Sequence, residues 1–165
     1  MPVTLTATDL SNLLACDRKV YLEYNGPETE RVLASDFDAW LIQQGREFEL
    51  RVLTGMDYVR PDYPAGRLEA GFSATHALMR HGAPAIYQGV LLAEQLAGIP
   101  DLLIRVEGPS ALGIHHYRPV DIKFGSEAKE RYRLQVMAYV WLLERLQGVR
   151  PEGRLILRPP RADAT

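Results

Sequence analysis

The second half of the chain alternates between short β-favouring runs and one long helical pattern. β-Branched, aromatic and other apolar residues favour strands in four runs: AIYQGVLL (85–92), DLLIRV (101–106), HYRPVDIKF (116–124) and RLIL (154–157). Residues 127–147 show the clearest helical spacing, and it recurs at 6–24, about 35–53 and about 67–81. The order of helices, three strands, a helix and a strand predicts an α/β fold, with a helical N-terminal part at about 6–82 and a sheet-helix core at about 84–158.

The length and composition suit one globular unit better than two. The chain has 165 residues, of which 47% are hydrophobic, enough to bury one substantial core, so we expect a single domain over residues 1–165. No apolar run is long enough to cross a membrane, and the start, MPVTLTATDL, lacks the basic and apolar segments of a signal peptide. We therefore expect a cytoplasmic protein that has no membrane partner.

Charge is distributed unevenly along the chain. Residues 1–117 hold 9 Lys and Arg against 15 Asp and Glu, whereas residues 118–165 hold 10 against 6. This asymmetry permits a basic surface for phosphates beside an acidic site for cations, although charged runs are usually only solvated faces. Cys16 is the single cysteine, so it forms no internal disulfide and cannot by itself hold zinc or an iron–sulfur cluster.

The triplet Asp121-Ile122-Lys123 lies inside the third β-favouring run. In a strand, residues two apart point to the same side, so the carboxylate and the ammonium group project together while Val120 and Ile122 face the opposite layer. The same kind of triplet occurs at residues 17–19, where a helical setting would turn its two charges apart. Only the strand copy is geometrically useful.

Asp101 opens the preceding β-favouring run, directly after Pro100. If the two runs pair as a hairpin through EGPSALGIHH, Asp101 and Asp121 come close at one end of the sheet. Two neighbouring carboxylates raise each other's pKa unless a cation lies between them, and oxygen ligands are those that Mg²⁺ or Mn²⁺ prefers. A lysine beside them can orient a water molecule or stabilise negative charge at a phosphate.

These residues together resemble the PD-(D/E)xK nuclease superfamily, and further motifs resemble its RecB-like branch. Pro100-Asp101 and Asp121-Ile122-Lys123 match the superfamily motif, and Gln135 and Tyr139 match the Q-x-x-x-Y signature of the branch. The opening TDLSNLLACDRKVYLEY resembles the N-terminal segment of the branch. GREFELRVL stands at its Gly-x-x-x-His motif, with Glu49 where histidine often stands. The resemblance covers about residues 6–158.

The resemblance implies a restriction-endonuclease-like core, in which a central mixed β-sheet is flanked by helices, and a metal-dependent nuclease acting on DNA. Asp101, Asp121, Glu49 and the backbone carbonyl of Ile122 would hold Mg²⁺ or Mn²⁺, and Lys123 would assist the attacking water. The residues implied to contact nucleic acid are Gln135, Tyr139, Arg18 and Lys19. Exonuclease-like action on single strands or ends, in DNA repair or defence, is implied by analogy.

The chain also departs from its relatives. The exonucleases of CRISPR adaptation in this branch hold an iron–sulfur cluster with four cysteines, so we expect no cluster in a chain that has Cys16 alone. Glutamate in place of histidine at position 49 would give a cation site made of oxygen ligands only. Some longer relatives carry this module ahead of a second nuclease-like domain. The chain is therefore either a stand-alone version of this module or a piece of a longer protein. In the second case we expect it to contact a second domain or a partner protein.

Two other interpretations stay open. The fold could serve as a catalytically inactive module that binds nucleic acid or a partner, or the motif matches could be chance in an ordinary α/β domain. Single residues also have plainer roles: Glu49, Arg18, Lys19 and Arg131 as surface charges, Tyr139 as core, and Trp40 and Trp141 as core.

Overall fold

A computed structural model describes residues 4–33 and 35–159 of the chain. The first half contains a two-residue strand and four α-helices, with a 3₁₀ turn, η1 (Glu28–Glu30), after the second helix: β1 (Leu5–Thr6), α1 (Ala7–Leu13), α2 (Asp17–Asn25), α3 (Asp36–Leu53) and α4 (Leu68–Arg80). The second half contains six strands and one helix: β2 (Ala85–Tyr87), β3 (Leu91–Ala93), β4 (Leu96–Gly98), β5 (Leu102–Ser110), β6 (Gly113–Lys123), α5 (Glu130–Gln147) and β7 (Arg154–Leu157). The fold is therefore α/β, as the sequence predicts.

The larger sheet has the strand order β2-β5-β6-β7 and is mixed. β5 pairs antiparallel with both β2 and β6, whereas β6 and β7 run parallel. The expected hairpin between β5 and β6 forms, and its register sets Leu102 opposite Val120. The start of β5 and the end of β6 consequently lie side by side, and this brings residues 101 and 121 together.

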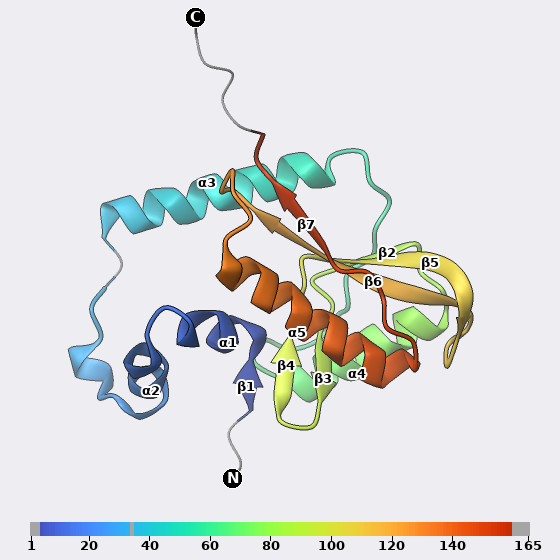
Figure 1. Cartoon of the computed structure of the whole chain (residues 1–165), viewed down its shortest axis with the longest axis horizontal. Coiled ribbons are helices and arrows are strands. Elements are labelled where there is room, and N and C mark those ends of the chain that lie inside the picture. Colours follow the sequence, from blue (N-terminus) through green and yellow to red (C-terminus); the bar gives the residue numbers. More distant parts are fainter. Residues whose placement is uncertain (1–3, 34, 160–165) are drawn as a thin grey trace, which may run out of the picture.

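Helices cover both faces of this sheet (Figure 1). On one face, residues of α5 such as Leu142 and Leu143 pack with Leu103 and Tyr117 of the sheet. On the other face, α3 contributes two residues to a second core, which consists of Phe48, Leu53, Leu102, Val120 and Ile122. Because strand residues alternate between faces, Asp121 and Lys123 lie on the α5 side and Ile122 lies on the α3 side.

The run AIYQGVLL is not one strand, contrary to the sequence prediction. It splits into β2, which belongs to the larger sheet, and β3, which belongs to a small three-stranded sheet with the order β1-β4-β3. The break falls at Gln88, whose φ is +53°, and at Gly89, where a Cβ would lie 2.9 Å from a methyl carbon of Leu103. A positive φ interrupts a strand, so the chain turns here from one sheet into the other.

The expected position of one aromatic residue is wrong. Trp40 is 49% exposed on α3, because the N-terminal half of this helix extends beyond the sheet (Figure 1). Trp141, in contrast, is partly buried against the main core, as expected. Thr6 caps the first helix and Asp9 completes a capping box, so α1 begins at Ala7, inside the expected helical range 6–24.

The end of α5 is fixed to β6 by a buried glutamine. The amide oxygen of Gln147 accepts the backbone N–H of Tyr117 at 2.8 Å, and its amide nitrogen donates to the carbonyl of the same residue at 2.9 Å. The helix then ends at Gly148, whose φ of +70° suits a left-handed cap. Within the described ranges, no helix has both the length and the apolarity needed to span a bilayer.

Candidate functional site

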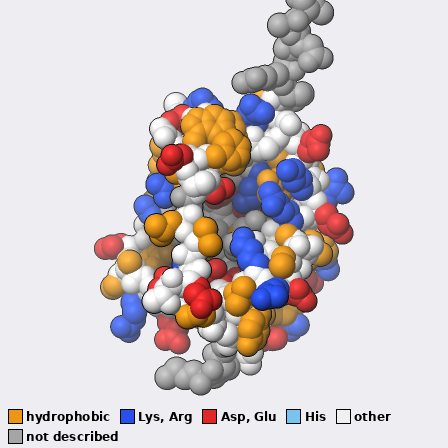
Figure 2. All heavy atoms as spheres, turned by 90° about the vertical axis from the view of Figure 1, so that its left-hand side faces the viewer, with side chains coloured by type: hydrophobic (Ala, Val, Ile, Leu, Met, Phe, Trp, Pro, Cys, Tyr) orange, Lys and Arg blue, Asp and Glu red, His pale blue; other side chains and the backbone are white. Residues whose placement is uncertain are grey.

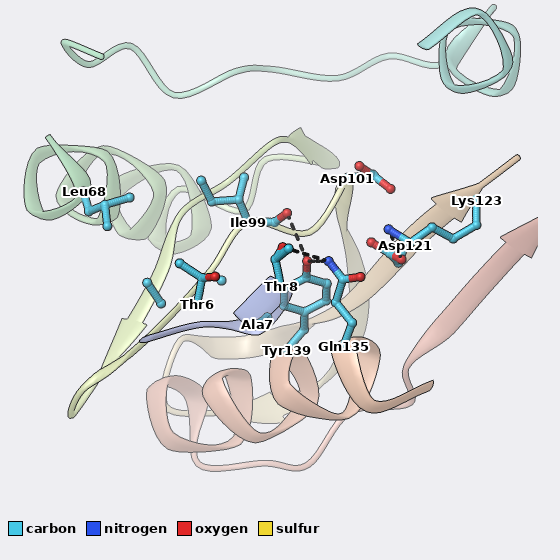
Figure 3. Close-up of a pocket in the computed structure, with 12 residues that line it drawn as sticks. Thr6, Ala7, Thr8, Leu68, Ile99, Asp101, Asp121, Lys123, Gln135 and Tyr139 are labelled. Atoms are coloured by element: carbon cyan, nitrogen blue, oxygen red, sulfur yellow. Dashed lines mark hydrogen bonds and ion pairs between the residues drawn. The ribbon is translucent and has the colours of Figure 1, made fainter. Parts of the chain in front are cut away.

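Five of the predicted site residues line one pocket of about 190 Å³ between the larger sheet, α1 and α5. They are Asp101, Asp121, Lys123, Gln135 and Tyr139, and Figure 3 shows them with the other lining residues. The pocket is lined by side chains from segments far apart in the sequence. The β5–β6 pairing brings the start of β5 next to the end of β6, and the first half of α5 packs beside them. The sequence pattern thus identified residues that are also neighbours in space.

Asp121 and Lys123 form an ion pair at the end of β6. The Lys123 Nζ lies 2.8 Å from the Asp121 Oδ2, and the side chains are 24% and 1% exposed, respectively. Although it has this ion-pair partner, Oδ2 of Asp121 accepts no hydrogen bond of good geometry from any described residue. A carboxylate this deeply buried is costly unless a positive charge compensates it, and Lys123 supplies that charge from the mouth of the pocket.

Asp101 lies just before β5 and reaches across to the neighbouring strand. Its Oδ2 accepts the backbone N–H of Ile122 at 2.5 Å, so the side chain extends the β5–β6 ladder by one bond. Burial, and next the charge of Asp121, raise the pKa of Asp101 to about 7, although the Ile122 N–H and Lys123 act in the opposite direction. Burial likewise raises the pKa of Asp121, and Lys123 opposes the shift.

Glu49 comes from α3, on the other side of the sheet from α5. It does not line the pocket, yet its negative charge contributes to raising the pKa values of both Asp101 and Asp121. Its Oε1 is buried and has no hydrogen-bond partner among the described residues. On β2, burial and then Glu49 raise the pKa of Tyr87 to about 12, which places this tyrosine beside Glu49.

Gln135 and Tyr139 are both buried, one turn apart on α5. The Gln135 amide donates to the Tyr139 hydroxyl at 2.8 Å and to the Thr8 hydroxyl at 3.5 Å. The Tyr139 hydroxyl donates in turn to the carbonyl of Ile99 at 3.3 Å, and dashed lines in Figure 3 mark these bonds. This chain of bonds connects α1, α5 and the segment before β5, so the two residues hold the wall of the pocket as well as lining it.

The structure also places residues that the sequence did not single out. Thr6 and Thr8 at the start of α1 line the pocket, and Tyr87 accompanies Glu49. No local pattern in the sequence marks them, because they reach the site only through the packing of α1 and β2. Arg18 and Lys19 lie on α2, in a separate surface pocket that does not include the aspartates.

The chemistry of the carboxylates suits a divalent cation. Glu49 and Asp121 each contribute a buried oxygen without a hydrogen bond of good geometry, although that of Asp121 is paired with Lys123, and burial is the main cause of the raised pKa values of Asp101 and Asp121. Hard oxygen ligands of this type fit Mg²⁺ or Mn²⁺. Among residues 4–33 and 35–159, however, no three His, Cys, Asp or Glu side chains converge into a ready-made metal site.

Taken together, the pocket offers two carboxylates, one ammonium group and a phenol–amide pair in a partly enclosed space. Such a set can bind a cation, orient a water molecule and stabilise negative charge that develops on a bound group. A scan against known protein families gives no match, and a search of curated proteins gives none either.

Proposed function

We propose that the chain is a divalent-metal-dependent nuclease of the RecB-like branch of the PD-(D/E)xK superfamily, which hydrolyses phosphodiester bonds in DNA. The observation that supports this most is the meeting of Asp101, Asp121 and Lys123 in one pocket at the end of two paired strands. The mixed sheet with α3 on one face and α5 on the other is compatible with the core of that superfamily.

The carboxylates are the proposed cation ligands. Asp101, Asp121 and Glu49, with the backbone carbonyl of Ile122, would hold Mg²⁺ or Mn²⁺, which supplies a Lewis acid for the phosphate and lowers the pKa of a bound water. Asp121 and Glu49 bring the buried oxygens that lack hydrogen bonds, and Asp101 brings a carboxylate already oriented by the Ile122 N–H.

Lys123 is the proposed electrostatic partner of the phosphate. Its ammonium group is held 2.8 Å from Asp121 and stays partly exposed, so it can contact a group that enters the pocket. It would orient the attacking water or stabilise the charge that builds up on the phosphate oxygens. Gln135 and Tyr139 would fix the wall against which the substrate lies.

The proposed mode is exonuclease-like action on single strands or DNA ends. A space of about 190 Å³ accommodates a phosphate with part of its nucleotide. This mode, and a role in DNA repair or defence, rest on the resemblance to the RecB-like branch.

The test is cleavage of end-labelled single- and double-stranded DNA in the presence of Mg²⁺, Mn²⁺ or chelator. We expect Asp121→Ala and Lys123→Ala to lower the cleavage rate by at least about 100-fold, since each removes a group that acts on the transition state. Asp17→Ala is the matched control, because it alters the aspartate of the second D-x-K triplet on α2, outside the pocket. Equal activity in the Asp121 and Asp17 variants would overturn the proposal.

A second candidate is a catalytically inactive module that binds nucleic acid or a partner protein on the same fold. It is favoured by the absence, within the described part of the chain, of three converging metal-ligand side chains. Calorimetry separates the two candidates: a chain that binds DNA but takes up neither Mg²⁺ nor Mn²⁺ supports the binding module.

A further inference from the structure

We propose that two basic residues at the pocket end of the larger sheet, Arg131 and Arg158, form a binding surface for the non-scissile phosphates of a nucleic-acid strand. These residues are called the basic rim below. The inference rests on the proposed function for the identity of the ligand and deepens it, because it assigns the direction in which the strand leaves the site.

The first part of the basic rim is held by Tyr132 in the first turn of α5. The guanidinium carbon of Arg131 lies 5.0 Å from the centre of the Tyr132 ring, and one of its nitrogens donates to the Tyr132 hydroxyl at 3.2 Å. The Nζ of Lys123 lies 5.8 Å from the same ring centre. Because both cations contact one ring, they lie within roughly 11 Å of each other, a short enough span for one strand to contact both.

The second part of the basic rim lies at the end of β7. The parallel register pairs Lys123 with Leu157, so Arg158 follows next to Phe124. Its guanidinium carbon lies 4.7 Å from the Phe124 ring centre, and its backbone N–H donates to the carbonyl of Gly125 at 3.1 Å. Phe124 itself packs edge-on against Phe48 of α3, with 6.2 Å between the ring centres. Phe124 faces α3, as Ile122 does, so Arg158 is held on the α3 side of the sheet end whose α5 side carries Lys123.

The charges of the basic rim are not neutralised within the described ranges. Neither of its two residues forms an ion pair there, whereas three other arginines of the C-terminal part do, Arg145 with Glu94, Arg150 with Glu144 and Arg154 with Glu152. A guanidinium that stacks on an aromatic ring keeps its donor edge free, and that edge matches the geometry of a phosphate. In Figure 2, Lys and Arg side chains gather beside a hollow on the face toward which the first turn of α5 points.

The main competing surface for a strand is the exposed aromatic pair on α3. Phe37 and Trp40 stack with 5.9 Å between their ring centres, an arrangement that could receive a base. However, Asp36 and Asp38 flank Phe37, and these carboxylates repel a phosphate backbone. Electrostatics therefore favours an exit over the basic rim.

The test measures binding apart from cleavage. A fluorescent single-stranded oligonucleotide is titrated with the chain in chelator, by anisotropy, over a series of salt concentrations. The variants are Arg131→Ala with Arg158→Ala, and as a matched control Arg145→Ala with Arg150→Ala, two exposed arginines that form ion pairs elsewhere on the molecule. The rim variant should lose roughly tenfold in affinity, and the slope of log K against log salt should fall by about 1.4 in magnitude, because each lost phosphate contact contributes about 0.7 for single strands.

The outcomes separate this inference from the proposed function. A rim variant that binds with the same affinity and salt slope as the unaltered chain overturns the inference, and so does an unaltered chain that binds no oligonucleotide. Asp121→Asn reports on the function alone, since it should abolish cleavage and retain binding. If the rim variant loses binding and the unaltered chain does not cleave DNA, the result supports the basic rim as a phosphate-binding surface and overturns the proposed nuclease function.

Discussion

Asp101 has two roles at the residue scale, because its carboxylate lies in the pocket and also completes the hydrogen bonding of the sheet. The bond that Oδ2 accepts from Ile122 takes the place of a backbone bond at the end of β5. The sequence predicted that Asp101 and Asp121 lie close together, because a hairpin between the two β-favouring runs brings the start of one next to the end of the other. It did not predict the bond to Ile122, which depends on the rotamer of one side chain.

The stability of the cation-free chain should depend on the proton of Asp101. The pKa is about 7 in the folded chain and ordinarily 3.8, so the folded state holds the proton more tightly and its contribution to stability is lost as pH rises from about 4 through 7. Asp101→Asn keeps an oxygen acceptor for Ile122 without the charge. We expect it to raise the free energy of unfolding above pH 7, on the order of 4 kcal/mol at most, and to flatten the pH dependence.

Urea unfolding at several pH values in chelator measures this effect. Asp57→Asn, in the loop after α3, is the control and should leave the pH dependence unchanged. If Asp101→Asn and the unaltered chain lose stability in parallel between pH 5 and pH 8, Asp101 does not carry the proton.

Divalent cations should stabilise the chain most where the aspartates are ionised. Mg²⁺ or Mn²⁺ at about 100 times its dissociation constant would add about 2.7 kcal/mol to the free energy of unfolding, or several degrees in the melting temperature. The gain should be larger at pH 8 than at pH 5.5, because the pKa of Asp101 is about 7 and a protonated carboxyl is a poor ligand. Thermal melts with and without chelator test this, and an equal gain in Asp121→Ala would show that the cation binds elsewhere.

At the element scale, α5 supplies the wall of the pocket, and its fit against β4 depends on a glycine. A Cβ on Gly98 would lie 2.7 Å from the Tyr139 ring and 2.9 Å from a methyl carbon of Leu142. The helix spacing of residues 127–147 predicted α5 well, because a long amphipathic pattern is a local property. β4 could not be predicted in the same way, since its three residues form a strand only by pairing with β1 and β3.

Gly98→Ala should therefore impair both stability and the site. The added methyl group would push the Tyr139 ring away and strain its bonds to Gln135 and Ile99, at a cost of roughly 1–3 kcal/mol. Gly45→Ala is the matched control: it is helical, has no atom within 4 Å of the new Cβ, and should stabilise α3 by up to about 1 kcal/mol. Chemical unfolding of the two variants measures the contrast, and equal effects would contradict the packing argument.

On the scale of the whole molecule, packing is uneven between the sheet and the N-terminal helices. β5 and β6 are covered by α3 and α5, whereas Phe37, Trp40 and Ile42 of α3 are 65%, 49% and 54% exposed. Sequence spacing predicted α3 as a helix but placed Trp40 in the core. Periodicity shows which residues share a face, and only the assembled structure shows whether anything covers that face.

Hydrogen exchange should follow this division. Amides of β5 and β6 are expected to exchange slowest, and those in α2 and in residues 36–44 of α3 orders of magnitude faster, because little buried surface opposes their opening. Exchange followed by mass spectrometry resolves these segments. Protection of residues 36–44 equal to that of β6 would mean that the outer half of α3 is covered in solution.

Asp101 and Asp121 differ in how much their replacement would disturb the fold, and this matters when the proposed function is tested by mutation. Replacing Asp101 with alanine removes a bond from the sheet as well as a carboxylate from the pocket, so loss of activity would be confounded with loss of structure. Asp121 accepts no hydrogen bond through its buried Oδ2, and an amide there keeps the size of the side chain. Asp121→Asn therefore tests the proposed function with less disturbance of the sheet than Asp101→Ala.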